Sequence, residues 1–182
     1  MIRFTFDPEK AIDAIEFIAR EKPGLSQYYV GKILFFADRE HILDYGRPIT
    51  GDRYVAMKDG PVPSAVRKLL NGEYAGPMAA RFFERVNVNH KGNLQLVYAK
   101  ADEAKSRLSG SDKEYLRESI AKHAHLTYGE LRDLSHEDAA WAEAWERDGS
   151  AAEEMNAELW LEELDNADAA KAELVENRRC VA

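Results

Sequence analysis

Apolar residues near the start of the chain recur at the spacing of a single helix face. The stripe consists of Ala11, Ile12, Ile15, Ile18 and Ala19. This spacing predicts an amphipathic helix. Asp7 is placed to cap the helix and Pro8 to occupy its first turn, where a missing N–H costs nothing. Pro23 and Gly24 are expected to end it.

The next apolar stretch is hydrophobic on nearly every side. Its apolar residues are Val30, Ile33, Leu34, Phe35, Phe36, Ala37, Ile42 and Leu43. Ser26 precedes the stretch as an N-cap, and Gly46 follows Tyr45 as a left-handed stop. A helix with so little polar surface packs on several sides. We therefore expect this helix to form the centre of the fold.

The middle of the chain alternates between turn residues and short extended segments. Residues 53–57 are predicted as a strand, residues 58–61 as a turn and residues 65–71 as a short helix closed by Gly72. Residues 83–89 and 94–99 alternate between apolar and polar positions, with a Gly-containing loop at residues 90–93. This pattern predicts a β-hairpin.

The remainder of the chain is predicted to be helical because helix-capping pairs mark its starts. These pairs are Ser111 with Glu114, Thr127 with Glu130, and Ser150 with Glu153. Asp165 or Asn166 is expected to cap a last helix that ends near residue 177. The composition turns acidic and Ala-rich near Gly149, which predicts a domain over residues 1–149 and an acidic helical extension over residues 150–182. The sequence leaves open whether the extension packs on the domain.

These elements together predict an α+β fold that is mainly α. A helical domain surrounds the central apolar helix, and it carries a small β-hairpin or sheet. The 45% of hydrophobic residues in a chain of 182 suffice for an ordinary core without disulfides or metals.

Cysteine usage and hydropathy indicate the compartment. Cys180 is the single cysteine, so no disulfide framework forms, as is typical of a reducing cytoplasm. The first residues lack the basic and apolar regions of a secretory signal, and no run of about 18 apolar residues predicts a membrane span. We expect a cytoplasmic protein with no membrane partner.

The charge is concentrated at the end of the chain. Lys and Arg number 25 and Asp and Glu number 33, and residues 143–182 hold 4 basic and 12 acidic residues (4 − 12 = −8), which is the whole net charge of −8. An anionic segment repels phosphate, so nucleic acid is not an expected partner. The segment either serves as a solvated acidic surface or attracts a basic protein.

His41 is the first candidate for chemistry, since it falls on an apolar face of the central helix. A buried imidazole needs hydrogen-bond partners, and Asp38 and Tyr45 are the nearest ones on the same helix. We favour a structural histidine over a ligand. Asp38, His41 and Asp44 share a face, but Arg39 competes with a metal ion, and His123 and His125 do not complete a ligand set. We expect neither a metal nor a cofactor.

No motif of nucleophilic or phosphate chemistry stands in the sequence. Cys180 lies in a tail expected to fray, and no serine occupies a Gly-x-Ser-x-Gly turn. Phosphate-binding glycine loops do not occur. We therefore do not expect an enzyme.

Two polar stretches stand out. In the loop over residues 46–63, an internal network is favoured in which Arg47, Arg53 and Lys58 pair with Asp38, Asp44, Asp52 or Asp59, although the same loop also suits recognition. In the second stretch, Ser135 is expected to cap the helix that carries a buried Trp141. His136 and Glu137 either face outward or return to the central helix.

A family resemblance rests on these two stretches. The first reads FADREHILDYGRPITGDRYVAMKDGPVPS, and it is followed by LTYGEL and by Ser-His-Glu-Asp-x-x-Trp. The whole resembles the Panacea domain of SocA-like antitoxins over about residues 10–145. The motif residues carried over by the resemblance are Phe36, Asp38, Arg39, His41, Tyr45, Gly46, Thr50, Asp52, Tyr54, Lys58, Gly60, Pro61, Pro63, His136, Glu137 and Trp141.

The resemblance implies a mainly helical domain that neutralises a protein toxin by direct contact, with no catalytic role for the motif. We accordingly expect an antitoxin whose partner is a cognate toxin. The candidate contact regions are the hairpin loop and the acidic segment, where Met155, Leu159, Trp160, Leu161 and Leu164 either bind the partner or close the protein's own core. The alternatives are a proteolytic adaptor for an ATP-dependent protease, a transcriptional regulator and a hydrolase centred on Asp38 and His41.

Overall fold

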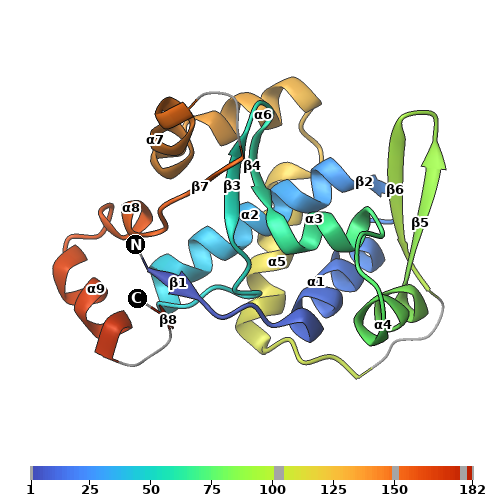
Figure 1. The fold of residues 1–182 in the computed structure, drawn as a ribbon, viewed down its shortest axis with the longest axis horizontal. Coiled ribbons are helices and arrows are strands. Elements are labelled where there is room, and N and C mark those ends of the chain that lie inside the picture. Colours follow the sequence, from blue (N-terminus) through green and yellow to red (C-terminus); the bar gives the residue numbers. More distant parts are fainter. Residues whose placement is uncertain (1, 101–104, 149–151, 177–179, 182) are drawn as a thin grey trace.

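The computed structural model describes residues 2–100, 105–148, 152–176 and 180–181. Helices build most of this part of the chain, and three small antiparallel sheets complete it (Figure 1). The predicted class, α+β and mainly α, is confirmed. Within these residues no helix has the length and apolar character needed to cross a membrane.

The first helix forms as its capping residues predict. Helix α1 spans Pro8–Glu21, and the Asp7 carboxylate accepts a hydrogen bond of 3.0 Å from the Lys10 backbone N–H. Its apolar stripe is buried. Asp13 and Glu16 are buried too, because both form ion pairs with Arg85.

Helix α2 (Gln27–Tyr45) occupies the middle of the molecule (Figure 1). It contacts α1, helix α5 (Gly110–His123) and strand β4 (Gly60–Pro63), so its apolar surface is covered on several sides, as predicted. Gly46 ends the helix with φ +62°, the left-handed conformation that glycine adopts at little cost. Ser26 stands at the N-cap position, but its side chain makes no capping hydrogen bond.

A three-stranded sheet lies against α2. Strand β3 (Tyr54–Met57) pairs with β4 on one edge and with β7 (Glu153–Glu154) on the other. The strand predicted at residues 53–57 is thereby confirmed. The turn predicted at residues 58–61 is wrong for Gly60 and Pro61, which begin β4. Prolines fit there because β4 is an edge strand, in which an N–H need not pair.

The second sheet is the predicted hairpin, with a shifted start. Strands β5 (Val86–Lys91) and β6 (Leu94–Ala99) pair across a short loop, and β2 (Leu25–Ser26) joins the free edge of β6. The strand predicted from residue 83 is wrong at its start, because residues 83–85 end helix α4 (Pro77–Arg85). The alternation there reflects a helix that buries Phe82 and exposes Phe83.

For the next two helices of the chain, the predicted capping box is wrong in the first and confirmed in the second. Helix α5 begins with a capping box of Ser109 and Asp112, not of Ser111 and Glu114. Helix α6 (Tyr128–His136) begins with the predicted box of Thr127 and Glu130. Helix α3 (Ser64–Leu70), earlier in the chain, matches the predicted short helix within one residue.

Helix α7 (Ala139–Asp148) carries Trp141, which is buried as predicted. Its cap is Asp138, whose carboxylate accepts from the Trp141 N–H at 2.9 Å. Ser135 was predicted in this role, but it lies within α6 and donates to the Arg132 carbonyl. The acid stands three residues before Trp141, the spacing that a cap requires.

The C-terminal segment contains strands as well as helices. After β7 come α8 (Glu158–Leu161) and α9 (Ala167–Glu176), and β8 (Cys180–Val181) pairs with β1 (Arg3–Phe4), so both chain ends lie side by side (Figure 1). The helix start predicted at Ser150 lies outside the described residues. Glu153 is in a strand, so the helical prediction is wrong there. The last helix begins directly after Asn166, as predicted.

Two apolar clusters form the core. The first joins α1 to the front of α2 and to the hairpin. The second surrounds Phe35 and Tyr54 and includes Met155, Trp160 and Leu161 of the C-terminal segment. These residues therefore pack on the preceding part of the chain. The proposed division at residue 149 remains a prediction.

Candidate functional site

Asp38 lies at the centre of the polar signature and is fully buried. Its Oδ1 accepts from the Ile49 N–H at 2.6 Å and from the Thr50 N–H at 3.3 Å. Its Oδ2 accepts from Thr50 Oγ1 at 3.0 Å and from the Tyr54 hydroxyl at 2.8 Å. Burial raises the pKa of this carboxyl group more than the four hydrogen bonds lower it. Asp38 thus fixes the loop after α2 to the helix itself.

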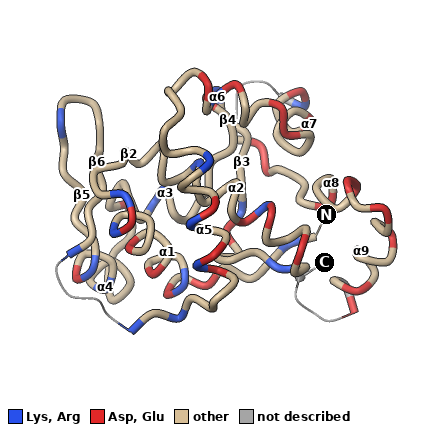
Figure 2. The backbone as a smooth tube through the Cα atoms, turned by 180° about the vertical axis from the view of Figure 1, so that it is seen from behind, with Lys and Arg blue, Asp and Glu red and all other residues tan. Residues whose placement is uncertain are grey.

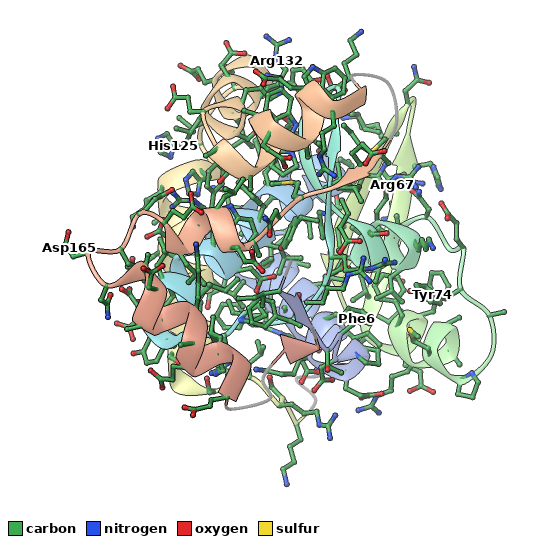
Figure 3. All side chains as sticks on the ribbon, turned by 60° about the vertical axis from the view of Figure 1, so that its left-hand side comes forward. Phe6, Arg67, Tyr74, His125, Arg132 and Asp165 are labelled. Carbon is green, nitrogen blue, oxygen red and sulfur yellow. The ribbon has the colours of Figure 1, made fainter. Side chains whose placement is uncertain are left out.

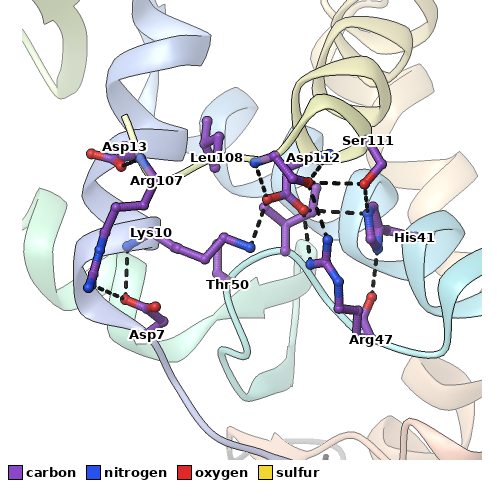
Figure 4. A network of polar contacts seen from close by, with 12 residues as sticks. Asp7, Lys10, Asp13, His41, Arg47, Thr50, Arg107, Leu108, Ser111 and Asp112 are labelled. Carbon is purple, nitrogen blue, oxygen red and sulfur yellow. Dashed lines mark hydrogen bonds and ion pairs between the residues drawn. The ribbon is translucent and has the colours of Figure 1, made fainter. Parts of the chain in front are cut away.

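His41 is buried in a second network, which joins α2 to α5 (Figure 4). Its Nδ1 lies 2.8 Å from the Arg47 carbonyl, and its Nε2 lies 3.1 Å from Ser111 Oγ. A carbonyl only accepts, so Nδ1 carries the proton and Nε2 accepts from Ser111. Burial lowers the pKa of His41, which favours this neutral form.

The partners of His41 differ from those predicted. Asp38 turns toward residues 49 and 50, and Tyr45 stacks on the imidazole at 4.7 Å between ring centres without a hydrogen bond to it. Residues on the same helix face support the ring from the side. Its nitrogens instead reach the Arg47 carbonyl and α5, a segment 70 residues away in the chain.

Asp112 is the anion of the second network (Figure 4). It pairs with Lys10 Nζ at 2.7 Å and with Arg47 Nη1 at 2.9 Å. Burial raises the pKa of Asp112, but hydrogen bonds from Lys10 and the Ser109 N–H outweigh burial and hold the pKa below its ordinary value. The network joins α1, α2 and α5 in one contact.

The loop over residues 46–63 forms an internal network, but with partners other than the predicted acids. Arg47 pairs with Asp112, and Arg53 pairs with Glu154 at 3.6 Å. Asp52 accepts from the N–H groups of Ala65 at 2.9 Å and Val66 at 2.8 Å, and so caps α3. Burial raises the pKa of Asp52 to about 6. Lys58 is exposed.

The second motif packs at the tip of the β3–β4 hairpin. His136 stacks on Trp141 with 3.8 Å between ring centres, and Trp141 Nε1 donates to the Met57 carbonyl at 3.1 Å. Glu137 faces outward. Arg39 on α2 binds Asp138 at 3.2 Å and Glu163 at 2.5 Å, which ties α2 to the cap of α7 and to the segment after α8.

A cavity of about 270 Å³ opens where the β3–β4 hairpin faces the first turns of α2. Lys32 lines it, although this side chain is 1% exposed. Its Nζ donates to the Pro61 carbonyl at 3.0 Å, and burial lowers its pKa to about 7. Lys32 was not among the residues predicted to form a site. A signal was present, because Lys32 lies within the apolar run from Val30 to Ala37, where a charged side chain interrupts the apolar residues.

Among the described residues, no group of three or more His, Cys, Asp or Glu side chains is arranged to hold a metal ion. Asp38 and His41 lie within one turn of each other on α2, but their polar atoms bind different segments. Asp38 accepts from Ile49, whereas His41 contacts Arg47 and Ser111. The buried polar atoms of Asp38 and His41 thus belong to two separate networks.

Comparison with protein families matches residues 30–142 to the SocA-like antitoxin, Panacea domain. The matched segment covers more than half of the chain and includes every residue of both motifs. The chain belongs to this family. No curated protein and no solved structure matches it.

The Panacea match begins within α2, later than the start expected near residue 10, and it ends within α7. Asp38, His41 and Asp52 therefore belong to the matched segment. In the network around His41, Asp112 lies inside the match but outside both motifs, and Lys10, which pairs with Asp112, precedes the match. The C-terminal segment lies outside the match.

The partner-binding candidates lie in that C-terminal segment of the Panacea protein. Met155 and Trp160 are buried in the second core cluster, so in this structure both residues close the protein's own core. Leu159 and Leu164 are partly buried. Leu164 also lines a groove of about 450 Å³ between the end of α2 and α8–α9, beside Tyr45, which is 48% exposed.

Proposed function

We propose that this Panacea protein is the antitoxin of a toxin–antitoxin pair and neutralises a cognate protein toxin by binding it directly. Membership of the SocA-like antitoxin family carries the proposal. A toxin partner is what that family suggests in general.

The geometry of the polar signature supports a binding role over catalysis. Asp38 and His41 are fully buried, and their polar atoms are bound to residues of the protein itself. A catalytic acid or base needs access to its substrate. We therefore include in the proposal that the signature residues maintain the scaffold and catalyse no reaction.

The groove between the end of α2 and α8–α9 is the proposed contact site. Its apolar floor includes Leu43, Leu161 and Leu164. Asp44 and Glu173 also line the groove. Further acidic residues lie along α7, α8 and α9 (Figure 2). Asp165 projects away from the ribbon between α8 and α9 (Figure 3). Charge complementarity favours a basic segment of the toxin with apolar side chains as the occupant.

Co-expression with the product of the adjacent reading frame tests the proposal. We expect growth to be restored and the two proteins to co-purify at a fixed ratio. The toxin released from the complex should have an unchanged mass, since binding modifies nothing. Restored growth without a complex, or a toxin of altered mass, would contradict direct neutralisation.

A further inference from the structure

Asp44, in the last turn of α2, presents a fixed carboxylate to the groove between α2 and α8–α9. The side chain is exposed, and its Oδ2 accepts a hydrogen bond from the Tyr115 hydroxyl of α5. Tyr115 is itself partly buried against the first core cluster, so it holds the carboxylate in place. Within the described part of the chain, Asp44 forms no ion pair, and its Oδ1 has no hydrogen-bond partner. A cation can therefore bind Asp44 without displacing another one.

Tyr45, the next residue, presents an aromatic surface to the same groove. Its ring stacks on the buried His41 with 4.7 Å between ring centres, yet the residue is 48% exposed. The centre of the Tyr115 ring lies 5.1 Å from that of His41 and 5.8 Å from that of Tyr45, so Tyr115 lies on the His41 side of the stack. Neither ring covers the opposite face of Tyr45. The electron-rich face of a tyrosine attracts cations.

The rest of the groove favours a cation on an apolar stem. Leu43 and Leu164 line it and are partly buried, while Asn166 and Glu173 supply further polar groups. None of the described residues that line the groove is basic. Arginine combines three methylene groups with a planar guanidinium that stacks on aromatic rings and donates two N–H groups to a carboxylate. The lysine ammonium is a more strongly hydrated point charge and matches this surface less well.

We propose that this end of the groove is an arginine-binding pocket, in which the guanidinium of one toxin residue stacks on Tyr45 and donates to Asp44 while its methylene groups pack on the leucines that line the groove. The inference rests on the proposed toxin groove and names the side chain that the groove recognises. Tyr115 is a positioning residue, since it contacts both Asp44 and Tyr45.

Small probes test the pocket on the full chain without the toxin. N-acetyl-arginine amide carries the guanidinium, N-acetyl-lysine amide carries an ammonium group, and N-acetyl-citrulline amide is a neutral analogue of nearly the same shape. In NMR titrations we expect the arginine probe to shift the ring resonances of Tyr45 with a dissociation constant on the order of 10 mM. The lysine probe should bind several-fold more weakly, and the citrulline probe about tenfold more weakly. Absence of a Tyr45 shift at about 100 mM, or equal binding of the citrulline probe, would overturn the proposal.

Matched variants test the pocket in the complex with the product of the adjacent reading frame. Asp44→Asn removes the charge but keeps an acceptor for the Tyr115 hydroxyl, and Tyr45→Leu removes the aromatic face. Each should weaken the complex about tenfold or more. The controls on α6 are Asp133→Asn, at an exposed acid, and Tyr128→Leu, at a tyrosine that is 46% exposed, and both should leave the affinity within about twofold of the wild type. Asp44→Asn covers the case in which Tyr45→Leu does not fold.

A scan of the toxin identifies the occupant of the pocket. Each arginine of the toxin is replaced in turn by lysine, and binding to the wild type and to the Asp44→Asn variant is compared. At one position the substitution should weaken binding to the wild type about tenfold, with a much smaller further effect in Asp44→Asn, because both changes break the same contact. Additive losses at every arginine would contradict the pocket.

The outcomes separate this inference from the proposed function. A stable complex that tolerates both Asp44→Asn and a folded Tyr45→Leu overturns the pocket and leaves direct neutralisation standing. Absence of any complex contradicts the proposed function, and the probes then decide the pocket alone. In that case selective binding of the arginine probe at Tyr45 supports the pocket, and its failure to bind refutes it.

Discussion

At the scale of single residues, Asp38 shows how the signature stabilises the fold. Its four donors are uncharged groups from residues 49, 50 and 54. The buried carboxylate therefore holds residues 49 and 50 of the loop and Tyr54 of β3 against α2. Loss of the acceptor leaves several buried donors without partners, each costing about 1–3 kcal/mol.

Substitution of Asp38 should therefore be severe. We expect Asp38→Ala to lower the free energy of unfolding by roughly 3–5 kcal/mol, and Asp38→Asn by less, because the amide oxygen still accepts from the Ile49 N–H. Urea unfolding measures both. The exposed Asp133→Ala on α6 is the control, expected within about 0.5 kcal/mol of the wild type. An Asp38→Ala protein as stable as this control would show that the loop holds without the carboxylate.

His123 makes stability depend on pH. The side chain is buried, stacks on Phe36 at 4.1 Å and contacts the Ser119 carbonyl at 2.8 Å. Burial lowers its pKa to about 4 from an ordinary value of 6.5. Because the folded pKa is depressed, the neutral ring contributes stability above pH 6.5 that is lost as the pH falls toward 4.

We expect His123→Phe to lack this acid-dependent loss. The difference in unfolding free energy between the wild type and the variant should then narrow as the pH falls from 6.5 to about 4. Asp52, whose pKa is raised to about 6, acts in the opposite direction, but it does so in both proteins. Denaturant titrations at stepped pH provide the measurement. A difference that stays constant with pH would contradict the role of His123.

At the scale of elements, Gly60 allows the β3–β4 hairpin to pack closely against α2 and α6. It adopts φ +96°, and a Cβ there would overlap Ser135 Oγ and Lys32 Nζ. Gly92 in the other hairpin loop has φ +60° and open space around it. The two glycines share backbone strain on substitution, but they differ in the room available to a side chain.

Gly60→Ala should accordingly cost more than Gly92→Ala. We expect Gly92→Ala to lose about 1–2 kcal/mol from backbone strain alone, and Gly60→Ala to lose about 1–3 kcal/mol beyond that from overpacking. Thermal and urea unfolding compare the two variants directly. Equal losses would mean that Lys32 and Ser135 move aside at no cost.

Local signals account for the elements that the sequence predicted. Asp7 with Pro8, Thr127 with Glu130, and Gly46 act within one or two helical turns, so their effect is readable from neighbouring residues. Strand β7 was missed because it exists through pairing with β3, about a hundred residues earlier. Helix α4 was missed since two adjacent phenylalanines resemble a strand as well as a helix.

The same distinction separates the predicted and unpredicted parts of the site. Burial of His41 and Trp141 followed from their apolar faces. The partners of His41 and Arg47 lie on α5, and sequence spacing within α2 carries no information about them. Lys32 was identifiable as a charged residue within the apolar run from Val30 to Ala37, but the cavity beside it depends on how the β3–β4 hairpin packs.

At the scale of the whole molecule, the C-terminal segment is needed to close the core. Met155, Trp160, Leu161 and Leu174 are all buried. Removal of one large buried side chain costs about 2–5 kcal/mol, and total stability is about 5–15 kcal/mol. The combined loss approaches or exceeds what the fold possesses.

A chain truncated at Gly149 should therefore lose cooperative unfolding. We expect near-ultraviolet circular dichroism to show loss of fixed aromatic packing, and Trp160→Ala to retain the fold at a cost of about 3–5 kcal/mol. A truncated chain with a sharp unfolding transition would contradict this and would support an independent domain over residues 1–149.

The distribution of acidic residues over the whole molecule distinguishes the proposed toxin-binding face, formed by α8 and α9, from the other surfaces. Acidic residues are frequent along α8 and α9 (Figure 2). Asp165 lies between these two helices and Asp168 lies in α9, and both are exposed. Glu84 on α4 and Glu114 on α5 are exposed acids on other elements. Reversal of either pair to lysine changes the net charge equally. A long-range effect of net charge alone would therefore act on both variants alike.

We expect Asp165→Lys with Asp168→Lys to slow association with the toxin about tenfold at low salt, and Glu84→Lys with Glu114→Lys to slow it much less. Stopped-flow or surface-binding kinetics measure both rates. The Debye length falls from about 30 Å at 0.01 M salt to about 10 Å at 0.1 M, so the two variants should converge as salt rises. Equal slowing at low salt would show that net charge, and not the face formed by α8 and α9, guides the toxin. A larger effect of the control pair would place the contact on the side of α4 and α5 instead.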